Sequence, residues 1–255
     1  MDQAQKARDF AALHVPGEPL VLYNVWDAGG AKIGVEAGAK AIATASWAVA
    51  AAHGYDDGET VPFDLALTVL ERITATVALP VTLDFEGGYA VEPTALATNV
   101  GRVIAAGAIG INFEDQIVGG DGLHGIDTQC ARIAALREAA DAAGVGLFIN
   151  ARTDLFLKEK DAAKHPAHLA EAKERGAAYA EAGASGFFVP ALNDPDLIAR
   201  VCAASRLPVN AIMLPGSPDT RRLAELGVAR ISYGPVAYRE AAATFAERYR
   251  TALDA

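Results

Sequence analysis

Two carboxylate side chains separated by one residue lie in the first half of the chain, at Asp84 and Glu86, directly before Gly87-Gly88. At the end of a strand, residues two apart project to the same side, so both carboxylates can face one ligand while the glycines let the chain turn. Alone, this pattern is more typical of solvated loop acids than of a site. Glu114 and Arg152, which follow the next two apolar runs, make a site the better interpretation.

Carboxylates that converge without partners repel one another and raise one another's pKa values. A hard divalent cation with oxygen ligands relieves this repulsion, and Mg²⁺ is the favoured ion, with Mn²⁺ as the alternative. The planar guanidinium of Arg152 suits a carboxylate or a phosphonate. An ion pair between Arg152 and a neighbouring acid is the alternative interpretation, and both can hold at once.

These groups require a scaffold that brings strand ends together. Eight short apolar runs, several of them rich in Val, Ile and Phe, recur along the chain with helical patterns between them. Most are too short for buried helices and are typical of strands buried on both faces, as in a parallel sheet. The runs are 20–23, 41–44, 81–85, 109–113, 147–150, 186–189, 209–212 and 230–233.

Helix signals lie between these runs at 62–76, 128–143, 167–182 and 219–226, and after the last run at 236–253. Eight strands alternating with about eight helices in about 250 residues fit a (β/α)₈ barrel of the TIM type. We expect one barrel domain over residues 1–255. An open doubly wound sheet would normally carry a G-x-G-x-x-G loop after its first strand, and the segment 24–30 (NVWDAGG) does not match it.

The active site of such a barrel lies at the carboxyl ends of its strands. In this sequence polar residues gather at those ends, namely Asn24, Asp27, Ser46, Asp84, Glu86, Glu114, Asp115, Arg152, Asp154 and Asn210. The candidate site is therefore expected at this mouth of the barrel.

Composition disfavours several classes of partner. Of 255 residues, 22 are basic and 32 acidic, and no run of Lys and Arg offers a stripe for nucleic acid phosphates. Cys130 and Cys202 match no metal-ligand spacing and are interpreted as small buried hydrophobes. The first ten residues lack the apolar core of a signal peptide, and no apolar stretch reaches the roughly 20 residues that span a bilayer. We expect a cytoplasmic protein without membrane or nucleic acid partners.

The motifs at the strand ends resemble those of the isocitrate lyase/phosphoenolpyruvate mutase superfamily. The resemblance extends from Asn24 to about Gly234, nearly the whole chain. It rests on the order and placement of six segments, which are 24–28 (NVWDA), 44–46 (TAS), 54–59 (GYDDGE), 84–89 (DFEGGY), 114–115 (ED) and 151–154 (ARTD).

This resemblance implies a (β/α)₈ barrel that binds Mg²⁺ and a 2-oxo acid, or its enolate, and cleaves or forms a C–C or P–C bond beside it. By position, Asp84, Glu86 and Glu114 would hold the metal, partly through water, with Asp57 beyond the direct ligands. Cleavage of a C–C bond next to a carbonyl leaves an enolate, and a chelated Mg²⁺ stabilises its negative oxygen.

The resemblance also implies a substrate site. The segment Ser46-Trp47-Ala48 would cradle the substrate carboxylate with its hydroxyl and backbone N–H groups. Arg152 would bind the carboxylate or the transferring group, and Asn210 aligns with a polar position that contacts substrate in the lyases.

Two substitutions within these motifs depart from the family pattern. The family commonly has Asp where this chain has Glu86, which is one methylene longer and reaches a metal with different geometry. Trp47 stands where Gly is usual, so its indole either narrows or covers the pocket, with the option of stacking on substrate, or turns away into packing.

The loop after Glu114-Asp115 departs most from the family pattern. Isocitrate and methylisocitrate lyases carry Lys-x-Cys-Gly-His there, with the Cys as the acid, and the mutases carry a Lys-Thr-Asn-Ser loop. This chain has 116–124 (QIVGGDGLH) instead, without Lys, Cys or Asn. His124 titrates in the useful range and is a candidate proton donor, although a solvated loop histidine is the more common case. Arg152, Asp57 and His124 are thus the candidate catalytic residues.

Three functions follow from these features. The leading hypothesis is a Mg²⁺-dependent lyase that cleaves or decarboxylates a small 2-oxo or 2-hydroxy acid and releases pyruvate or a similar product. The second is a P–C bond enzyme, either a mutase or a phosphonopyruvate hydrolase, which the missing Lys and Asn disfavour. The third is a barrel that binds metal and a 2-oxo acid without catalysis.

The segment 236–253 has the pattern of an amphipathic helix after the last strand. In the resembled superfamily the eighth helix is often exchanged between protomers, which gives dimers and tetramers. The resemblance therefore implies a homo-oligomer.

Overall fold

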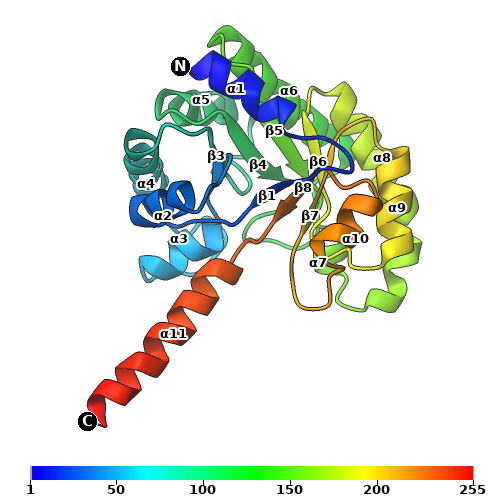
Figure 1. Cartoon of the computed structure of the whole chain (residues 1–255). Coiled ribbons are helices and arrows are strands. Elements are labelled where there is room, and N and C mark those ends of the chain that lie inside the picture. Colours follow the sequence, from blue (N-terminus) through cyan, green and yellow to red (C-terminus); the bar gives the residue numbers. More distant parts are fainter. Residues whose placement is uncertain (1, 255) are drawn as a thin grey trace.

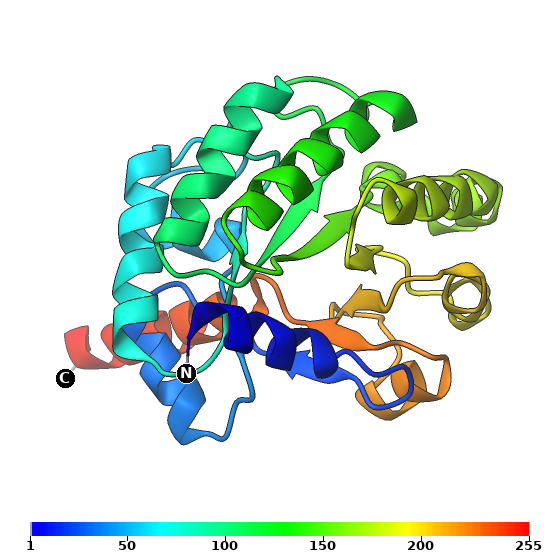
Figure 2. The ribbon, with the colours of Figure 1, turned by 90° about the horizontal axis from the view of Figure 1, so that it is seen from above.

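Eight parallel strands form a barrel in the computed structural model, which describes residues 2–254 (Figures 1 and 2). Strands pair in chain order from β2 to β8, and β8 pairs with β1. The ring closes through a parallel bridge between Val25 and Thr44, beyond β1 and β2. The strands are β1 (Leu20–Leu22), β2 (Ile42–Ala43), β3 (Val81–Asp84), β4 (Gly110–Glu114), β5 (Phe148–Arg152), β6 (Gly186–Phe188), β7 (Val209–Ile212) and β8 (Arg230–Ser232). The expected (β/α)₈ barrel is confirmed.

Helices surround the strands (Figure 2). Several begin with an aspartate whose carboxylate accepts N–H groups of the first helical turn, as Asp27, Asp194 and Asp219 do. The helices are α1 (Gln3–Ala12), α2 (Ala28–Glu36), α3 (Ser46–Ala52), α4 (Phe63–Thr76), α5 (Pro93–Ala105), α6 (Ile126–Ala142), α7 (Leu155–Lys158), the 3₁₀ turn η1 (Ala162–Lys164), α8 (His165–Glu181), α9 (Pro195–Ala204), α10 (Thr220–Glu225) and α11 (Val236–Leu253).

Helix α1 lies at the amino ends of the strands, opposite the expected site. Its Phe10 is fully buried, and the Phe10 and Phe148 ring centroids are 5.4 Å apart. His14 follows the helix and stacks on the ring of Phe148, the first residue of β5, at 4.0 Å. These rings leave the carboxyl ends of the strands as the mouth for a site.

A polar layer lies inside the barrel below that mouth. The strand register places Asp84, Asn112 and Asn150 side by side on β3, β4 and β5. Across the barrel, Asn210 and Arg230 pair on β7 and β8. The two asparagines, Asn210 and Arg230 are all buried, so the barrel interior is hydrogen-bonded as well as apolar.

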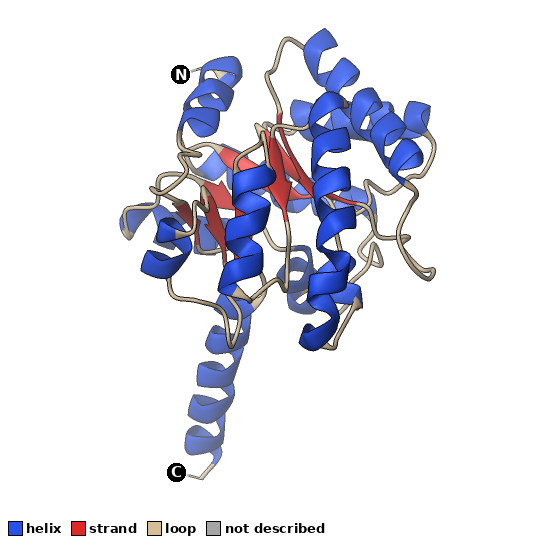
Figure 3. Cartoon of the chain, turned by 90° about the vertical axis from the view of Figure 1, so that its right-hand side faces the viewer, coloured by secondary structure: helices blue, strands red, loops and turns tan. Residues whose placement is uncertain are grey.

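Helix α11 projects away from the barrel (Figures 1 and 3). Its only buried residue is Ala237, near its start, whereas Phe245, Tyr249 and Leu253 are 69%, 58% and 74% exposed. Among residues 2–254 there is no helix with both the length and the apolar character needed to traverse a bilayer.

Candidate active site

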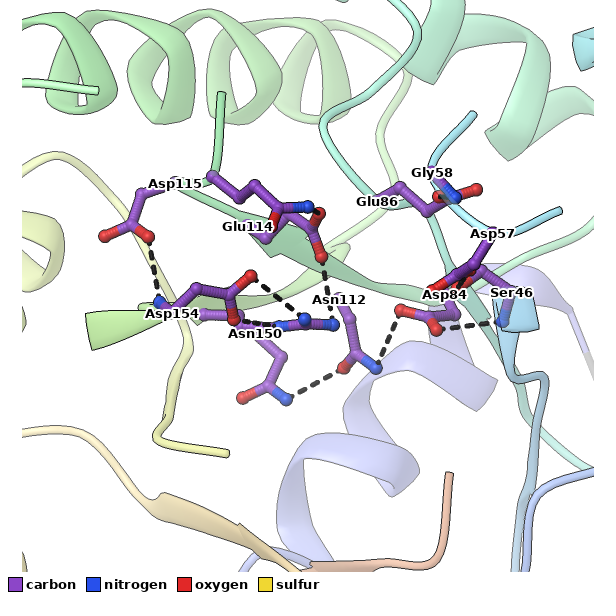
Figure 4. A network of polar contacts seen from close by, with 12 residues as sticks. Ser46, Asp57, Gly58, Asp84, Glu86, Asn112, Glu114, Asp115, Asn150 and Asp154 are labelled. Atoms are coloured by element: carbon purple, nitrogen blue, oxygen red, sulfur yellow. Dashed lines mark hydrogen bonds and ion pairs between the residues drawn. The ribbon is translucent and has the colours of Figure 1, made fainter. Parts of the chain in front are cut away.

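Asp84 ends β3 and points into the mouth of the barrel. Its Oδ2 accepts the backbone N–H of Ser46 at 2.9 Å, and its Oδ1 accepts the amide Nδ2 of Asn112 at 3.4 Å (Figure 4). Its own N–H donates to the Thr44 hydroxyl at 2.9 Å. Three neighbouring segments of the barrel therefore fix this carboxylate.

Glu86 lies two residues beyond the strand, and here the structure corrects an expectation. Its backbone has φ of 52°, in the left-handed region, so strand alternation does not direct its side chain toward the same side as Asp84. Its Oε2 instead accepts the N–H groups of Gly58 and Glu59 at 3.1 and 2.8 Å. Burial first, and then the charge of Asp84, raise the pKa of Glu86 to about 8.

Glu114, Arg152 and Asp154 form an ion-pair cluster on β4 and β5. Arg152 Nη1 lies 2.9 Å from Glu114 Oε2, while its Nε and Nη2 donate to the two oxygens of Asp154 at 2.5 and 3.0 Å (Figure 4). Burial raises the pKa of Glu114, and Arg152 opposes that shift. The ion pair between Arg152 and neighbouring acids is thus present, as one of the two interpretations of this arginine predicted.

A buried support behind this cluster was not found from the sequence. Asp115 Oδ1 accepts the N–H of Asp154 at 3.0 Å, and its Oδ2 accepts Tyr179 Oη at 2.7 Å and Arg175 Nη1 at 3.1 Å. The only signal for Arg175 and Tyr179 is their spacing of one helical turn on α8, which is too common to indicate a site. They hold the segment that places Asp154 against Arg152.

The predicted substrate segment begins α3. The Ser46 hydroxyl donates to Asp57 Oδ1 at 3.3 Å. Desolvation of the Asp57 carboxyl, and then the charge of Asp84, raise its pKa. Ala48 is fully buried in α3, which leaves Ser46 as the polar side chain of this segment.

Trp47 packs against the start of α11. The guanidinium of Arg239 lies 4.4 Å from the centre of its ring, and Tyr238 approaches at 6.0 Å with its ring edge-on. The structure therefore shows the indole packed against α11, and contact between Trp47 and substrate stays a prediction.

Within residues 2–254, Asn210 and His124 form no hydrogen bond or ion pair with the side chains of the acidic cluster. Asn210 is buried inside β7, where its Nδ2 lies 3.2 Å from the Ser232 hydroxyl. His124 is held by its backbone, whose N–H donates to Asp115 O at 2.8 Å and whose carbonyl accepts Arg175 Nη1 at 2.9 Å. Burial, and then the charge of Arg132, lower the pKa of its imidazole.

The donors at this mouth suit a hard cation. Asp57, Asp84, Glu86 and Glu114 supply only oxygen atoms, and the pKa values of three of them are raised. Within residues 2–254, no three His, Cys, Asp or Glu side chains are close enough to ligate one ion together. The donor chemistry therefore fits a cation that reaches some of these carboxylates through water.

Residues 10–253 match the family model described as phosphoenolpyruvate phosphomutase. The chain belongs to this family. It is 34% identical over 229 residues to an uncharacterized protein of Mycobacterium tuberculosis strain H37Rv, covering 90% of this chain and 83% of the other. It is 30% identical over 216 residues to 2-methylisocitrate lyase of Escherichia coli K12, covering 78% and 70% respectively.

Solved structures agree with this membership. A candidate phosphonomutase from Burkholderia cenocepacia J2315 superposes with a TM-score of 0.96 at 47% identity, covering 98% of this chain and all of the other. A phosphonopyruvate hydrolase complex with oxalate and Mg²⁺ superposes with a TM-score of 0.84 at 23% identity, covering 96% and 86%. At that identity the second likeness shows the shared fold alone. Named relatives at 30% identity or more include a phosphoenolpyruvate phosphomutase from Streptomyces hygroscopicus and the 2-methylisocitrate lyase.

Proposed function

We propose that this protein is a Mg²⁺-dependent lyase that acts on a small 2-oxo or 2-hydroxy carboxylic acid. The observation that carries the proposal is the cluster of Asp84, Glu86 and Glu114 beside Arg152 at the mouth of the barrel. A buried cluster with more acids than cations favours a bound cation, and a spare guanidinium surface favours an anionic ligand. Family members of known name include a 2-methylisocitrate lyase, which supports the reaction class.

The residues that would hold the metal are Asp84 directly and Glu86 and Glu114 through water. Asp84 is fixed by donors on two sides, and each of its oxygens retains a lone pair toward the mouth. Asp57 lies near enough for its pKa to respond to Asp84, so it belongs to the same charge cluster. When bound, Mg²⁺ would polarise the oxygens of a 2-oxo acid and stabilise the enolate left by bond cleavage.

Arg152 would bind the substrate anion without leaving its present partners. A guanidinium has five N–H donors; two of them donate to Asp154, and Nη1 forms an ion pair with Glu114. The remaining donors on Nη1 and Nη2 suit a carboxylate oxygen. Glu114 and Asp154 thus hold the Arg152 guanidinium in an orientation that suits anion binding.

The possible reactions differ in which group donates the proton to the enolate. The loop 116–124 has neither the Lys nor the Cys of the isocitrate lyase motif, so the proton donor is either His124 or solvent. Decarboxylation needs no Cys because water can protonate the enolate. The Gln116 amide, which donates to Glu114 Oε1 at 3.1 Å, keeps this loop in contact with the acidic cluster.

A P–C bond enzyme is the second candidate. The 47% identity to a candidate phosphonomutase favours it. The absence of the mutases' Lys and nucleophilic Asn from residues 116–124 counts against it. Release of pyruvate together with phosphate from phosphonopyruvate would establish this alternative and replace the C–C lyase.

The test of the proposed site is a calorimetric titration of oxalate, a flat dianion that mimics the pyruvate enolate, with and without Mg²⁺. Binding only with Mg²⁺ is expected, and it should be lost in Asp84→Asn but kept in the matched control Asp121→Asn, on an exposed loop. No binding in either condition would refute the proposal. With binding established, a panel of 2-oxo and 2-hydroxy acids followed by pyruvate release identifies the substrate.

We also propose that the protein is a homo-oligomer in which α11 packs on a second copy. An apolar groove of about 1060 Å³ lies along β1 and α2, lined in part by Val21, Ile33 and Ala37. The unpartnered side of α11 carries the complementary apolar side chains Phe245 and Tyr249. The start of α11 also lines this groove, through Ala237 and Ala241 among others, so the helix of a second copy would pack beside it.

A further inference from the structure

Arg230 is a cation buried inside the barrel, beneath the acidic cluster. It begins β8 and is 0% exposed. Within residues 2–254 it forms no ion pair at salt-bridge distance. Its Nη2 donates to Asn112 Oδ1 at 3.1 Å and its Nε to the Ser232 hydroxyl at 3.3 Å, while Nη1 lacks a hydrogen-bond partner there. A buried guanidinium held only by neutral groups is costly, which indicates a role beyond packing.

The Arg230 bond fixes which way the Asn112 amide points. Asn112 Oδ1 also accepts the amide Nδ2 of Asn150 at 2.9 Å, so two donors converge on one oxygen (Figure 4 shows the Asn150 link). Flipping the amide would turn its NH₂ group toward both donors. The NH₂ group therefore has to point the other way.

That direction leads to Asp84. Asn112 Nδ2 lies 3.4 Å from Asp84 Oδ1, and Ser46 holds the other carboxylate oxygen. The amide offers Asp84 only a donor, which suits a carboxylate oxygen as acceptor. The chain of contacts runs from Arg230 through Asn112 to Asp84, across strands β8, β4 and β3.

Electrostatics agree with this chain of contacts. Burial lowers the pKa of Arg230 to about 9, and the charge of Asp84 opposes the shift. Arg230 is therefore still a cation at neutral pH. The charge of Asp84 raises the pKa of Arg230, although Asn112 lies between the two residues.

We propose that Arg230 is a positioning residue, which orients the Asp84 carboxylate through the Asn112 amide for metal and substrate binding. This inference rests on the proposed function of the site. Partners behind a metal ligand typically contribute 10–100-fold to metal affinity, and here Asn112 contacts Asp84 directly while Arg230 acts on it through Asn112.

The test is a double-mutant cycle on oxalate affinity at saturating Mg²⁺. Arg230→Met and Asn112→Leu are each expected to weaken binding about tenfold, and the double variant no further, because both act through one path. Arg137→Met is the control, since this half-buried arginine donates to Leu147 O and Gly183 O away from the site. It should lower thermal stability and leave the affinity unchanged.

Strictly additive losses, or unchanged affinity in Arg230→Met, would overturn the proposal. If Arg230→Met does not fold, Arg230→Lys replaces it. Lysine keeps the charge but lacks the fork that joins Asn112 and Ser232, so a partial loss is expected.

A second measurement separates this inference from the proposed function. Wild-type protein that fails to bind oxalate with Mg²⁺ refutes the function, not the positioning role. A ligand-free crystal structure of Arg230→Lys tests the positioning role by itself. A turned Asn112 amide or a displaced Asp84 carboxylate is expected, and unchanged positions of both would refute it.

Discussion

At Arg152 one side chain combines structural and ligand-binding roles. It neutralises Glu114, which is 4% exposed, and still has donors left for an anion. We expect Arg152→Met to weaken Mg²⁺-dependent oxalate binding at least tenfold, because a hydrogen bond to a charged group contributes about 1.5–3 kcal/mol. Thermal stability should also fall, since Glu114 remains buried without its partner.

Calorimetry and thermal unfolding measure the two effects separately. Arg200→Met, at an exposed position on α9, is the control and should change neither quantity. Full oxalate affinity in Arg152→Met would show that the guanidinium has only the structural role.

His14 makes folding stability depend on pH. Burial, and then the charge of Arg230, lower its pKa to about 3, against about 6.5 in an unfolded chain. Between about pH 3 and 6.5, His14 is therefore protonated in the unfolded chain and neutral in the folded protein. The contribution of neutral His14 to the free energy of unfolding is fully present above pH 6.5. It declines by up to about 1.4 kcal/mol per pH unit as the pH falls toward 3.

Urea unfolding of wild type and His14→Gln at pH 7.5 and 5.0 measures this dependence. The wild-type advantage over the variant should shrink by about 2 kcal/mol between these values. An advantage independent of pH would mean that His14 accepts its proton in the folded state.

At the scale of elements, the turn after β3 depends on Gly88. Its φ is 85°, and a Cβ there would lie 2.4 Å from Leu96 Cδ2 and 3.1 Å from Phe113 Cε2, both in buried side chains. We expect Gly88→Ala to destabilise the protein by about 2 kcal/mol or more, through backbone strain and overpacking together. Oxalate binding should weaken as well, because this turn carries Glu86.

Gly101 provides the matched control within α5. A Cβ at this position meets no atom within 4 Å, so Gly101→Ala should stabilise the helix by about 0.5–1 kcal/mol. Urea unfolding midpoints compare the two variants. Equal effects at both glycines would show that the turn after β3 relaxes without cost.

The elements themselves were predictable because apolar run length and helical spacing are local properties of the sequence. The runs at 81–85 and 109–113 correspond to β3 and β4, and the helical pattern at 236–253 corresponds to α11. The strand ends then predicted which side chains share the mouth. The left-handed backbone of Glu86 was not predictable, since nothing in Phe85-Glu86-Gly87 requires it.

The supporting contacts were also beyond the sequence, because they depend on the register of strands far apart along the chain. Arg230 lies in the predicted last strand, but its contact with Asn112 spans the barrel interior. Arg175 lies 60 residues from Asp115 along the chain. A buried arginine near the start of an apolar run is the one local sign that sequence reasoning could use.

At the scale of the whole molecule, the apolar face of the amphipathic helix α11 requires a surface to pack against. The sequence pattern does not say whether that surface belongs to the same chain or to a second copy. Phe245 and Tyr249 lie one turn apart on α11, with ring centroids 5.9 Å apart, and both are exposed. Leaving them in water is unfavourable at about 25 cal/mol per Å² of apolar surface. The groove along β1 and α2 of a second copy offers the surface to bury them.

Phe245→Asp combined with Tyr249→Asp should therefore convert the oligomer into a monomer, as measured by light scattering. Charged groups in an apolar groove carry a desolvation cost that a helix exchange cannot offset. Ala243→Asp is the control, since two residues along a helix turn its side chain to nearly the opposite face. A wild-type protein of monomeric mass would refute the exchange. An oligomer that survives the double substitution would assign the interface to a different surface.

Because Trp47 packs on Arg239 at the start of α11, a monomeric variant should also show weaker oxalate binding if the exchanged helix steadies the segment that begins with Ser46.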